Sequence, residues 1–249
     1  MTKACAPIVL FCDFGLPYTG QMKAKLVQGA PNHTIIDLFH DVPAHDVRAG
    51  SVLLAAHAAD FPVGCVFVCV VDPGVGSDQR KPGVVFAGGR WFVGPLNGLF
   101  EHVLRRWPID AKAYEVTWSP EYLSASFHGR DLFAPVAAFI ARGDLSGLAP
   151  VAIDDVCRSD FPDDVLEIVY VDSFGNLMTG LRWDSLAADE TIEVAGRVLP
   201  RLRTFSDAES GQLFVYENAV GLTEIAANQG NARNKLEIGP GTRIKVIKV

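Results

Sequence analysis

The sequence predicts an α/β protein with two parts, an N-terminal domain around a doubly wound, mostly parallel sheet and a smaller C-terminal all-β, barrel-like domain. Three observations support this expectation. Apolar strand-like runs alternate with helical segments in the first part of the chain. The run Cys65–Val71 is apolar on both faces, as a central parallel strand should be. Beyond Pro150, short alternating runs separated by turns replace the helices.

The first part of the chain supplies the elements of the parallel sheet. The sequence predicts strands over 8–12, 34–38 and 65–71, a hairpin of 84–87 with 90–93, and helices over 20–28, 47–60, 98–106 and 132–142. Asp46, Asn97 and Asp131 stand directly before three of these helices and suit N-cap positions. Ligands of such sheets bind beyond the carboxyl ends of the strands, where Asp13 and Asp72 are expected.

The second part of the chain is expected to contain strands only. We expect residues 1–152 to form the N-terminal domain, 153–164 an acidic linker and 165–249 the C-terminal domain. Strands are predicted over 166–172, 177–181, 191–194, 212–217, 222–227 and 243–249. Turn residues such as Gly175-Asn176 separate them.

Composition narrows the class of protein. The 249 residues are 49% hydrophobic, which suffices for a sizeable core, and the formal net charge is −7. No basic stripe favours nucleic acid, and no long apolar run or leader pattern favours a membrane or secretion. The five cysteines form no Cys-x-x-Cys pair, so we expect reduced thiols and a cytoplasmic location.

Three short motifs place chemical groups beside predicted turns. In VVDPGVG, one proline and two glycines force a sharp turn after a buried strand and leave Asp72 available at its tip. In FHGRD, His128 precedes a helix, which favours a neutral imidazole that can accept a proton or orient water. In DFG, Asp13 has two carboxylate oxygens that suit a sugar diol. The structural alternatives are a turn-stabilising aspartate, a capping loop and an Asx-turn, respectively.

Several histidines and aspartates cluster in the sequence around residue 45. His40, His45 and His57, with Asp41 and Asp46, match no familiar metal-site spacing, so structural or capping roles are favoured. A metal-dependent hydrolase that uses Asp13, His40, Asp72 and His128 remains an alternative.

Eight segments, taken together and in order, resemble one family. They are DFG, PYTGQMK, IIDLFHDVP, VVDPGVGS, FVGPLNGLF, FHGRDLFAP, VDSFGNLMT and EIAANQGNA. This string is similar to the S-adenosyl-L-methionine (SAM) hydroxide adenosyltransferases, or SAM hydrolases, which are relatives of the SAM-dependent fluorinase and chlorinase. The resemblance implies that SAM and water give adenosine and methionine without a metal or other cofactor. It also implies a homotrimer whose sites combine the N-terminal domain of one subunit with the C-terminal domain of the next.

The resemblance also assigns residues. Asp72, Arg80 and His128 correspond to the Asp-Arg-His set of the hydrolases, and Asp13 corresponds to the carboxylate that holds the ribose hydroxyls. The implied substrate positions of the C-terminal domain are Asp172 and Asn176, then Phe205, Asn231 and Ala232 on the adenine side, and the motif positions Asn218 and Glu224.

The chain departs from the family pattern at three places. The usual arginine position, seven residues after the aspartate, holds Gln79, and Arg80 follows one residue later. Where the family has an acidic residue after DFG, this chain has Leu16. The family's Asn-Ser pair is Asn218-Ala219 here.

These departures leave two further alternatives, a nucleoside-binding protein without turnover and a SAM-dependent halogenase. Fluorinase-type relatives carry a long insertion after the DPGVG region, whereas the stretch from 80 to 97 is short here. This short stretch, together with Asp72 and His128, favours water as the nucleophile.

Overall fold

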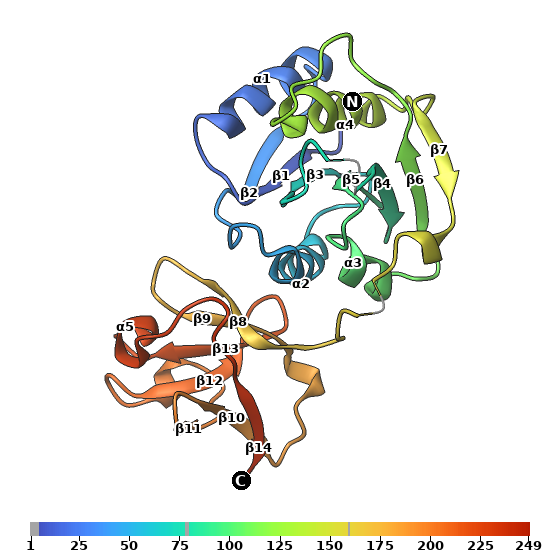
Figure 1. Cartoon of the computed structure of the whole chain (residues 1–249). Coiled ribbons are helices and arrows are strands. Elements are labelled where there is room, and N and C mark those ends of the chain that lie inside the picture. The colour runs from blue at the N-terminus through green and yellow to red at the C-terminus, as the bar shows by residue number, and fades with distance from the viewer. Residues whose placement is uncertain (1–4, 78–79, 159) are drawn as a thin grey trace. The chain divides into compact units, whose positions relative to one another are not determined.

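The computed structural model describes residues 5–77, 80–158 and 160–249, which divide into two compact units, Met1–Phe161 and Pro162–Val249 (Figure 1). Gln79, which stands at the family's usual arginine position, lies outside the described residues. The domain limits expected at 152 and 165 stay a prediction.

The first unit contains a sheet of seven strands in the order β2-β1-β3-β5-β4-β6-β7. Its strands are β1 (Ile8–Cys12), β2 (Ile35–Phe39), β3 (Val66–Val70), β4 (Pro82–Ala87), β5 (Arg90–Pro95), β6 (Lys112–Val116) and β7 (Leu148–Val151). Strands β2, β1, β3 and β5 pair in parallel, while β4 and β7 run against their neighbours. The mostly parallel sheet is therefore confirmed.

Helices cover both faces of this sheet, as a doubly wound fold requires. They are α1 (Tyr18–Gly29), α2 (Val47–Ala58), α3 (Glu101–Arg106) and α4 (Ala134–Ala141). Helices α1 and α4 lie on one face, and α2 and α3 lie on the other (Figure 1).

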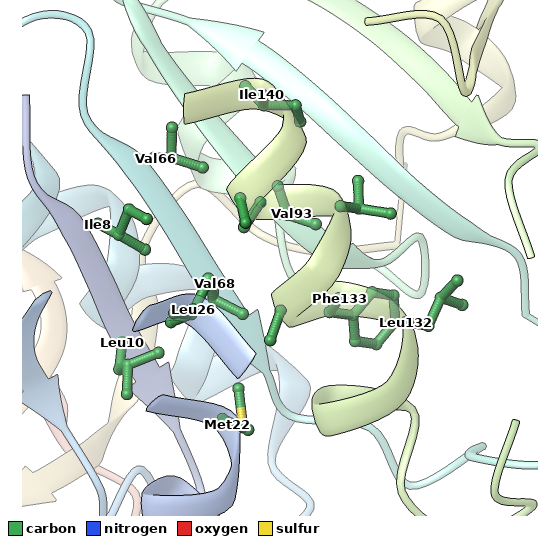
Figure 2. Close-up of a cluster of buried hydrophobic side chains, with 14 of the residues drawn as sticks. Ile8, Leu10, Met22, Leu26, Val66, Val68, Val93, Leu132, Phe133 and Ile140 are labelled. Carbon is green, nitrogen blue, oxygen red and sulfur yellow. The ribbon is translucent and has the colours of Figure 1, made fainter. Parts of the chain in front are cut away.

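Alternation along the central strands forms the core beneath α1 and α4. Ile8 and Leu10 of β1, together with Val66 and Val68 of β3, point to the same face and are fully or almost fully buried (Figure 2). Met22 of α1 completes this layer, and each such side chain contributes about 1.5–3 kcal/mol on burial. This packing fixes the strand ends that carry Asp13 and Asp72.

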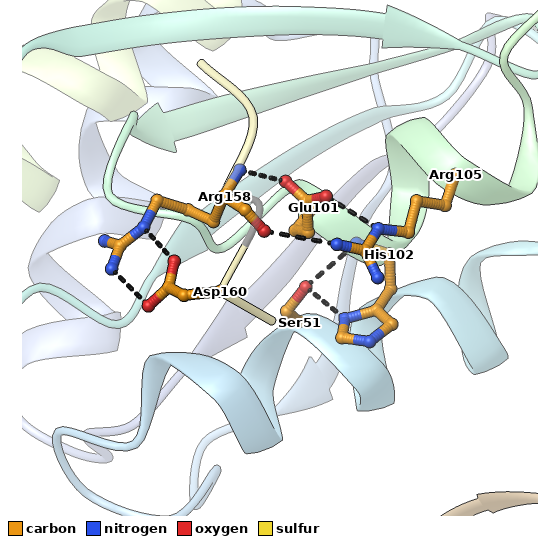
Figure 3. A network of polar contacts seen from close by, with 6 residues as sticks. All are labelled: Ser51, Glu101, His102, Arg105, Arg158 and Asp160. Atoms are coloured by element: carbon orange, nitrogen blue, oxygen red, sulfur yellow. Dashed lines mark hydrogen bonds and ion pairs between the residues drawn. The ribbon is translucent and has the colours of Figure 1, made fainter. Parts of the chain in front are cut away.

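One predicted helix cap is confirmed and two are wrong. The Asp46 side chain accepts a hydrogen bond from Ala49 N at 2.9 Å and caps α2. Helix α3 begins only at Glu101, because the Asn97 side chain bonds to Val71 O and Leu99 N instead. The Glu101 side chain accepts hydrogen bonds from Arg105 Nε and Arg158 N, in a polar network at the start of α3 (Figure 3). Asp131 lies inside a π-helical turn, η1 (Gly129–Phe133), that precedes α4.

The second unit contains two antiparallel sheets that are not closed into a barrel. Their strand orders are β11-β10-β14 and β12-β13-β9-β8. The strands are β8 (Val165–Val171), β9 (Leu177–Arg182), β10 (Glu190–Val194), β11 (Arg197–Leu199), β12 (Leu213–Glu217), β13 (Leu222–Ala227) and β14 (Lys245–Lys248). A short helix, α5 (Ala232–Leu236), which the sequence did not predict, interrupts this all-β unit.

Within the described residues, no helix combines the length and apolar character needed to cross a lipid bilayer.

Candidate active site

A cavity of about 510 Å³ opens where β1 and β3 end in the first unit. Asp13 directly follows β1 and Asp72 follows β3 by two residues, and both line this cavity, as does His128. The placement expected for ligands at the carboxyl ends of parallel strands is thus the one observed.

The DPGVG turn brings Asp72 close to the segment that carries His128. The turn is closed by hydrogen bonds from Val75 N to Asp72 O at 3.2 Å and from Ser77 N to Gly74 O at 3.1 Å. Gly76 has φ +78°, and a Cβ there would lie 2.3 Å from Ala125 O. Only glycine fits this position, because a side chain would clash with backbone as well as strain the turn.

Arg80 joins the two residues singled out by the motifs. Its Nε donates to Asp72 Oδ1 at 3.0 Å, and its Nη2 lies 2.5 Å from Asp72 Oδ2 and 2.7 Å from His128 Nδ1. The Arg80 and Asp72 side chains are only 6% and 3% exposed, so solvent screens this ion pair little. The guanidinium also lies over the Phe133 ring, 5.5 Å from its centroid.

The bonds of Arg80 leave two polar atoms for a further partner. Asp72 Oδ2 lies in the ion pair with Arg80 Nη2, and it is buried and accepts no hydrogen bond from the described residues. A guanidinium only donates, so His128 Nδ1 accepts and the neutral imidazole carries its proton on Nε2. The site therefore offers one acceptor, Oδ2, and one donor, Nε2–H.

The surroundings of His128 favour this neutral form. Burial lowers the pKa of His128, and the positive charge of Arg80 lowers it further, while Asp72 and Asp131 act in the opposite direction. The lowered pKa agrees with the predicted neutral imidazole, but its main causes are burial and Arg80 rather than the end of a helix.

Asp131, which the sequence placed as a helix cap, instead organises the segment before His128. Its carboxylate accepts from Ser124 N at 3.1 Å and receives both Nε and Nη2 of Arg130, at 2.7 and 2.8 Å. Arg130 also bonds to Gln21 Oε1 of α1 at 2.9 Å and lies over the ring of Phe127. These contacts hold Phe127 and His128 against the cavity.

An aromatic wall lines the cavity beside these polar groups. Phe14, Tyr18 and Phe127 all line it, and each pair of their rings meets edge to face with centroids 5.5–6.0 Å apart. This arrangement gives the cavity one apolar side and one charged side.

In the second unit, four predicted site residues gather at the β8–β9 turn and the start of α5. Asp172 accepts from Asn176 N at 2.8 Å and from Asn176 Nδ2 at 2.9 Å. Asn231 caps α5, with Ala232 buried as the first helical residue. Gly175 has φ +82°, and a Cβ there would lie 2.1 Å from Asn231 Nδ2, so the turn and the cap fit together only with glycine.

The other three predicted residues of this unit surround Tyr216. Glu224, 2% exposed, accepts from Tyr216 OH at 2.5 Å and from Asn218 Nδ2 at 2.9 Å. Burial raises the pKa of Glu224, and the two donors oppose this. Phe205 packs edge to face on Tyr216 with ring centroids 5.3 Å apart.

The structure thus groups the predicted residues within each unit and adds residues that the sequence did not single out for the site. The additions are His45, Phe127, Arg130 and Tyr216, and all but Tyr216 line the cavity of the first unit. The alternation of side chains along β12 was the one feature of the sequence that could have identified Tyr216. Phe127 and Arg130 could have been identified from their positions one and two residues away from His128.

The histidines considered as metal ligands do not converge. His57 Nδ1 bonds to Leu53 O at 2.9 Å, and His40 Nε2 lies 3.3 Å from Asp37 Oδ1. In the part of the chain that the structure describes, no three His, Cys, Asp or Glu side chains are grouped to hold a metal ion.

Comparison with known proteins finds one family along both units. Models of the N-terminal and C-terminal domains of SAM hydroxide adenosyltransferase match residues 8–148 and 166–245. Two proteins named (R)-S-adenosyl-L-methionine hydrolase are each 36% identical to this chain. The one from Thermus thermophilus aligns over 97% of this chain and 99% of its own length, and the one from Salinispora arenicola over 98% of each. A fluorinase from Nocardia brasiliensis is more distant, at 25% identity over 98% of each chain.

Solved structures agree with these matches. An uncharacterised conserved protein from Thermotoga maritima superposes with a TM-score of 0.80 at 30% identity, covering 97% of this chain and all of that one. A conserved hypothetical protein from Thermus thermophilus gives 0.76 at 32% identity with the same coverage. Both domain models and the full-length relatives place the chain in the SAM hydroxide adenosyltransferase family.

Proposed function

We propose that this protein hydrolyses SAM to adenosine and L-methionine, with water attacking C5′ of the adenosyl group. The observation that carries the proposal is the Arg80 bridge, which holds Asp72 and His128 together on one cavity. Near-full-length relatives named SAM hydrolases support the same reaction.

We assign a single water molecule to two polar atoms of the site, Asp72 Oδ2 and His128 Nε2. Asp72 Oδ2 accepts a hydrogen bond from the water, and His128 Nε2–H donates one to the water oxygen. These two bonds fix the direction of the second lone pair of the water oxygen. Neutral His128 is required, because a protonated ring would add positive charge beside a cationic substrate. Alignment of the water with the reacting carbon lowers the barrier by several kcal/mol, about 7–11 in the most favourable cases.

The reaction suits a site whose charges cancel. The Asp72 carboxylate and the Arg80 guanidinium compensate each other, and the substrate supplies one sulfonium charge. As the water oxygen bonds to C5′, the C5′–S bond breaks, its electron pair returns to sulfur, and neutral methionine thioether leaves. The water proton passes to the Asp72 carboxylate, the nearest acceptor, and then to solvent.

The remaining predicted residues are proposed to bind the substrate. Asp13 takes ribose hydroxyls, while Asp172, Asn176, Phe205, Asn218, Glu224, Asn231 and Ala232 hold or shape the adenosyl and methionine ends. We also propose the homotrimer that the family resemblance implies, with sites that use the N-terminal part of one subunit and the C-terminal part of the next. Free cysteines agree with the predicted cytoplasmic location, which stays a prediction.

The decisive test is incubation with SAM in ¹⁸O-labelled water, followed by chromatography and mass spectrometry. We expect equimolar methionine and adenosine, with the label at the 5′-oxygen of adenosine. Label-free adenosine, or other products, would contradict attack at C5′. Parallel reactions with chloride or fluoride test for 5′-halo-adenosine, the product expected of a halogenase. Adenosine binding without methionine release would favour the nucleoside-binding alternative.

Variants of the water-binding pair test the assignment of roles. Asp72→Asn removes the carboxylate that takes up the water proton, and His128→Ala removes one contact to the proposed water, so we expect kcat to fall by about 10²–10⁴ in each variant. Circular dichroism and thermal unfolding serve as controls for folding. Turnover close to that of the wild type in both variants would refute the assignment.

A further inference from the structure

A strained turn lies at the edge of the cavity beside Asp13. Asp46 N donates to Pro43 O at 3.0 Å, which closes a four-residue turn, and His45 at its third position has φ +64°. This is the pattern of a type II turn, whose third position has a positive φ and favours glycine or asparagine. The chain nevertheless carries a histidine at this position.

His45 differs from the other non-glycine residues with positive φ among those described. Ala195, Gln229 and Glu237 belong to the second unit, the first two directly before a glycine and the third at the C-terminal cap of α5. His45 instead lines the cavity that contains Asp72 and His128. A strained residue at a cavity, where glycine would be easier to accommodate, points to a use for its side chain or its backbone.

The backbone of His45 holds Asp13. His45 N donates to Asp13 Oδ2 at 2.9 Å across 32 positions of the sequence. Within the described residues, Asp13 Oδ1 makes no hydrogen bond and stays available to a ligand. The positive φ of His45 therefore sets the direction of the N–H that fixes this carboxylate.

His45 adds an imidazole to the residues that line the cavity with Asp13. Where the family has an acidic residue after DFG, this chain has Leu16, which is 82% exposed and is not part of the cavity lining. An imidazole offers one donor and one acceptor, either of which suits a sugar hydroxyl. His45 thus brings a second group that can bind a hydroxyl to the cavity that Asp13 lines.

We propose that His45 is a second ribose-binding residue beside Asp13. Its N–H fixes Asp13 for one ribose hydroxyl, and its imidazole bonds to the other. This inference rests on the proposed function, in that the nucleoside is the adenosyl part of SAM.

The first experiment tests the imidazole with adenosine and its 2′-deoxy and 3′-deoxy analogues, using isothermal titration calorimetry. His45→Gly is the informative variant, because glycine tolerates the positive φ and keeps the N–H to Asp13. We expect the wild type to bind each deoxy analogue about tenfold more weakly than adenosine. We expect His45→Gly to lose this discrimination for one analogue and to keep it for the other. Equal discrimination in wild type and His45→Gly for both analogues would overturn the role of the imidazole.

The second experiment tests the backbone with His45→Ala as the matched variant. Alanine also removes the imidazole but resists the positive φ, so the turn moves and Asp13 is held less firmly. We expect His45→Ala to bind adenosine several-fold more weakly than His45→Gly, with no such difference when Asp13→Ala is added to both. A difference that persists without the Asp13 carboxylate, or no difference at all, would overturn this part.

Adenosine binding and SAM cleavage are read separately in these experiments. A wild type that binds adenosine but does not cleave SAM would refute the proposed function and leave the result for His45 readable. A wild type that cleaves SAM while His45→Gly keeps its KM and its nucleoside discrimination would refute this inference alone. With SAM as substrate, we expect His45→Gly to raise KM and to leave kcat nearly unchanged. The reason is that His45 is proposed to bind the ribose, away from the reacting carbon.

Discussion

Replacing Arg80 by alanine is the sharpest perturbation of this protein, because one side chain neutralises Asp72 and sets the tautomer of His128. The variant loses the Nε bond to Asp72 Oδ1 at 3.0 Å, the Nη2 contact to Oδ2 and the bond to His128 Nδ1 at 2.7 Å. The remaining carboxylate, 3% exposed, is then buried without its countercharge. Removing one partner of such a pair lowers the free energy of unfolding by about 3–5 kcal/mol.

This loss fits within a typical total stability of about 5–15 kcal/mol, so Arg80→Ala is expected to fold at low temperature. Urea unfolding of Arg80→Ala and Arg80→Lys, with SAM turnover measured on the same preparations, makes the prediction testable. Lysine keeps the charge but lacks the planar fork that reaches both partners. We therefore expect Arg80→Lys to recover most of the stability but to remain at least about tenfold slower than wild type. The reasoning fails if Arg80→Ala unfolds within about 1 kcal/mol of wild type, or if Arg80→Lys turns over like wild type.

Four further predictions concern pH and the second unit. Because the pKa of His128 is lowered, kcat/KM should stay high as the pH falls below the ordinary histidine range. Arg80→Ala removes a positive charge and should raise the pH at which kcat/KM falls. Arg80→Lys keeps a positive charge and should raise this pH less. Because the pKa of His128 is lower in the folded protein, His128 is protonated at a higher pH in the unfolded chain than in the folded one. The free energy of unfolding should therefore decrease as the pH falls through the ordinary histidine range. Gly175→Ala should weaken adenosine binding and lower the melting temperature, because its Cβ would displace Asn231; an unchanged Kd would contradict this. Folded Glu224, with its raised pKa, keeps its proton to higher pH than the unfolded chain does, so stability should fall as pH rises above the ordinary glutamate range. Glu224→Gln should flatten that slope in a denaturation series, and an unchanged slope would count against it.

Most of the first unit could be predicted from local patterns, since buried parallel strands are continuous apolar runs. The runs at Ile8–Cys12 and around Val66–Val70 became β1 and β3, and the polar residues after them became the cavity edge. The cap at Asp46 was also predictable, because it needs only a suitable side chain before the helix.

Elements whose structure depends on distant partners were missed. Strand β6 (Lys112–Val116) contains lysine and glutamate and lies between β4 and β7, so its pairing is not visible as an apolar run. Helix α5 has five residues, too short for a periodic pattern, and it is stabilised by the Asn231 cap. Asp131 had the position of a cap, but Arg130 and Ser124 N compete for its carboxylate.

The candidate site shows the same division between local and distant information. Motif position alone identified Asp72 and His128 as available side chains, yet 56 residues separate them, and neither position reveals what joins them. Arg80 stands one place away from the family spacing, and the bonds of its guanidinium identify it as the partner of both. Because Arg80 occupies Nδ1 and neutralises Asp72, it sets these two groups up as the acceptor and the donor of the proposed water site. The chemistry therefore depends less on the distance along the sequence from Asp72 to the arginine than on the orientation of the guanidinium.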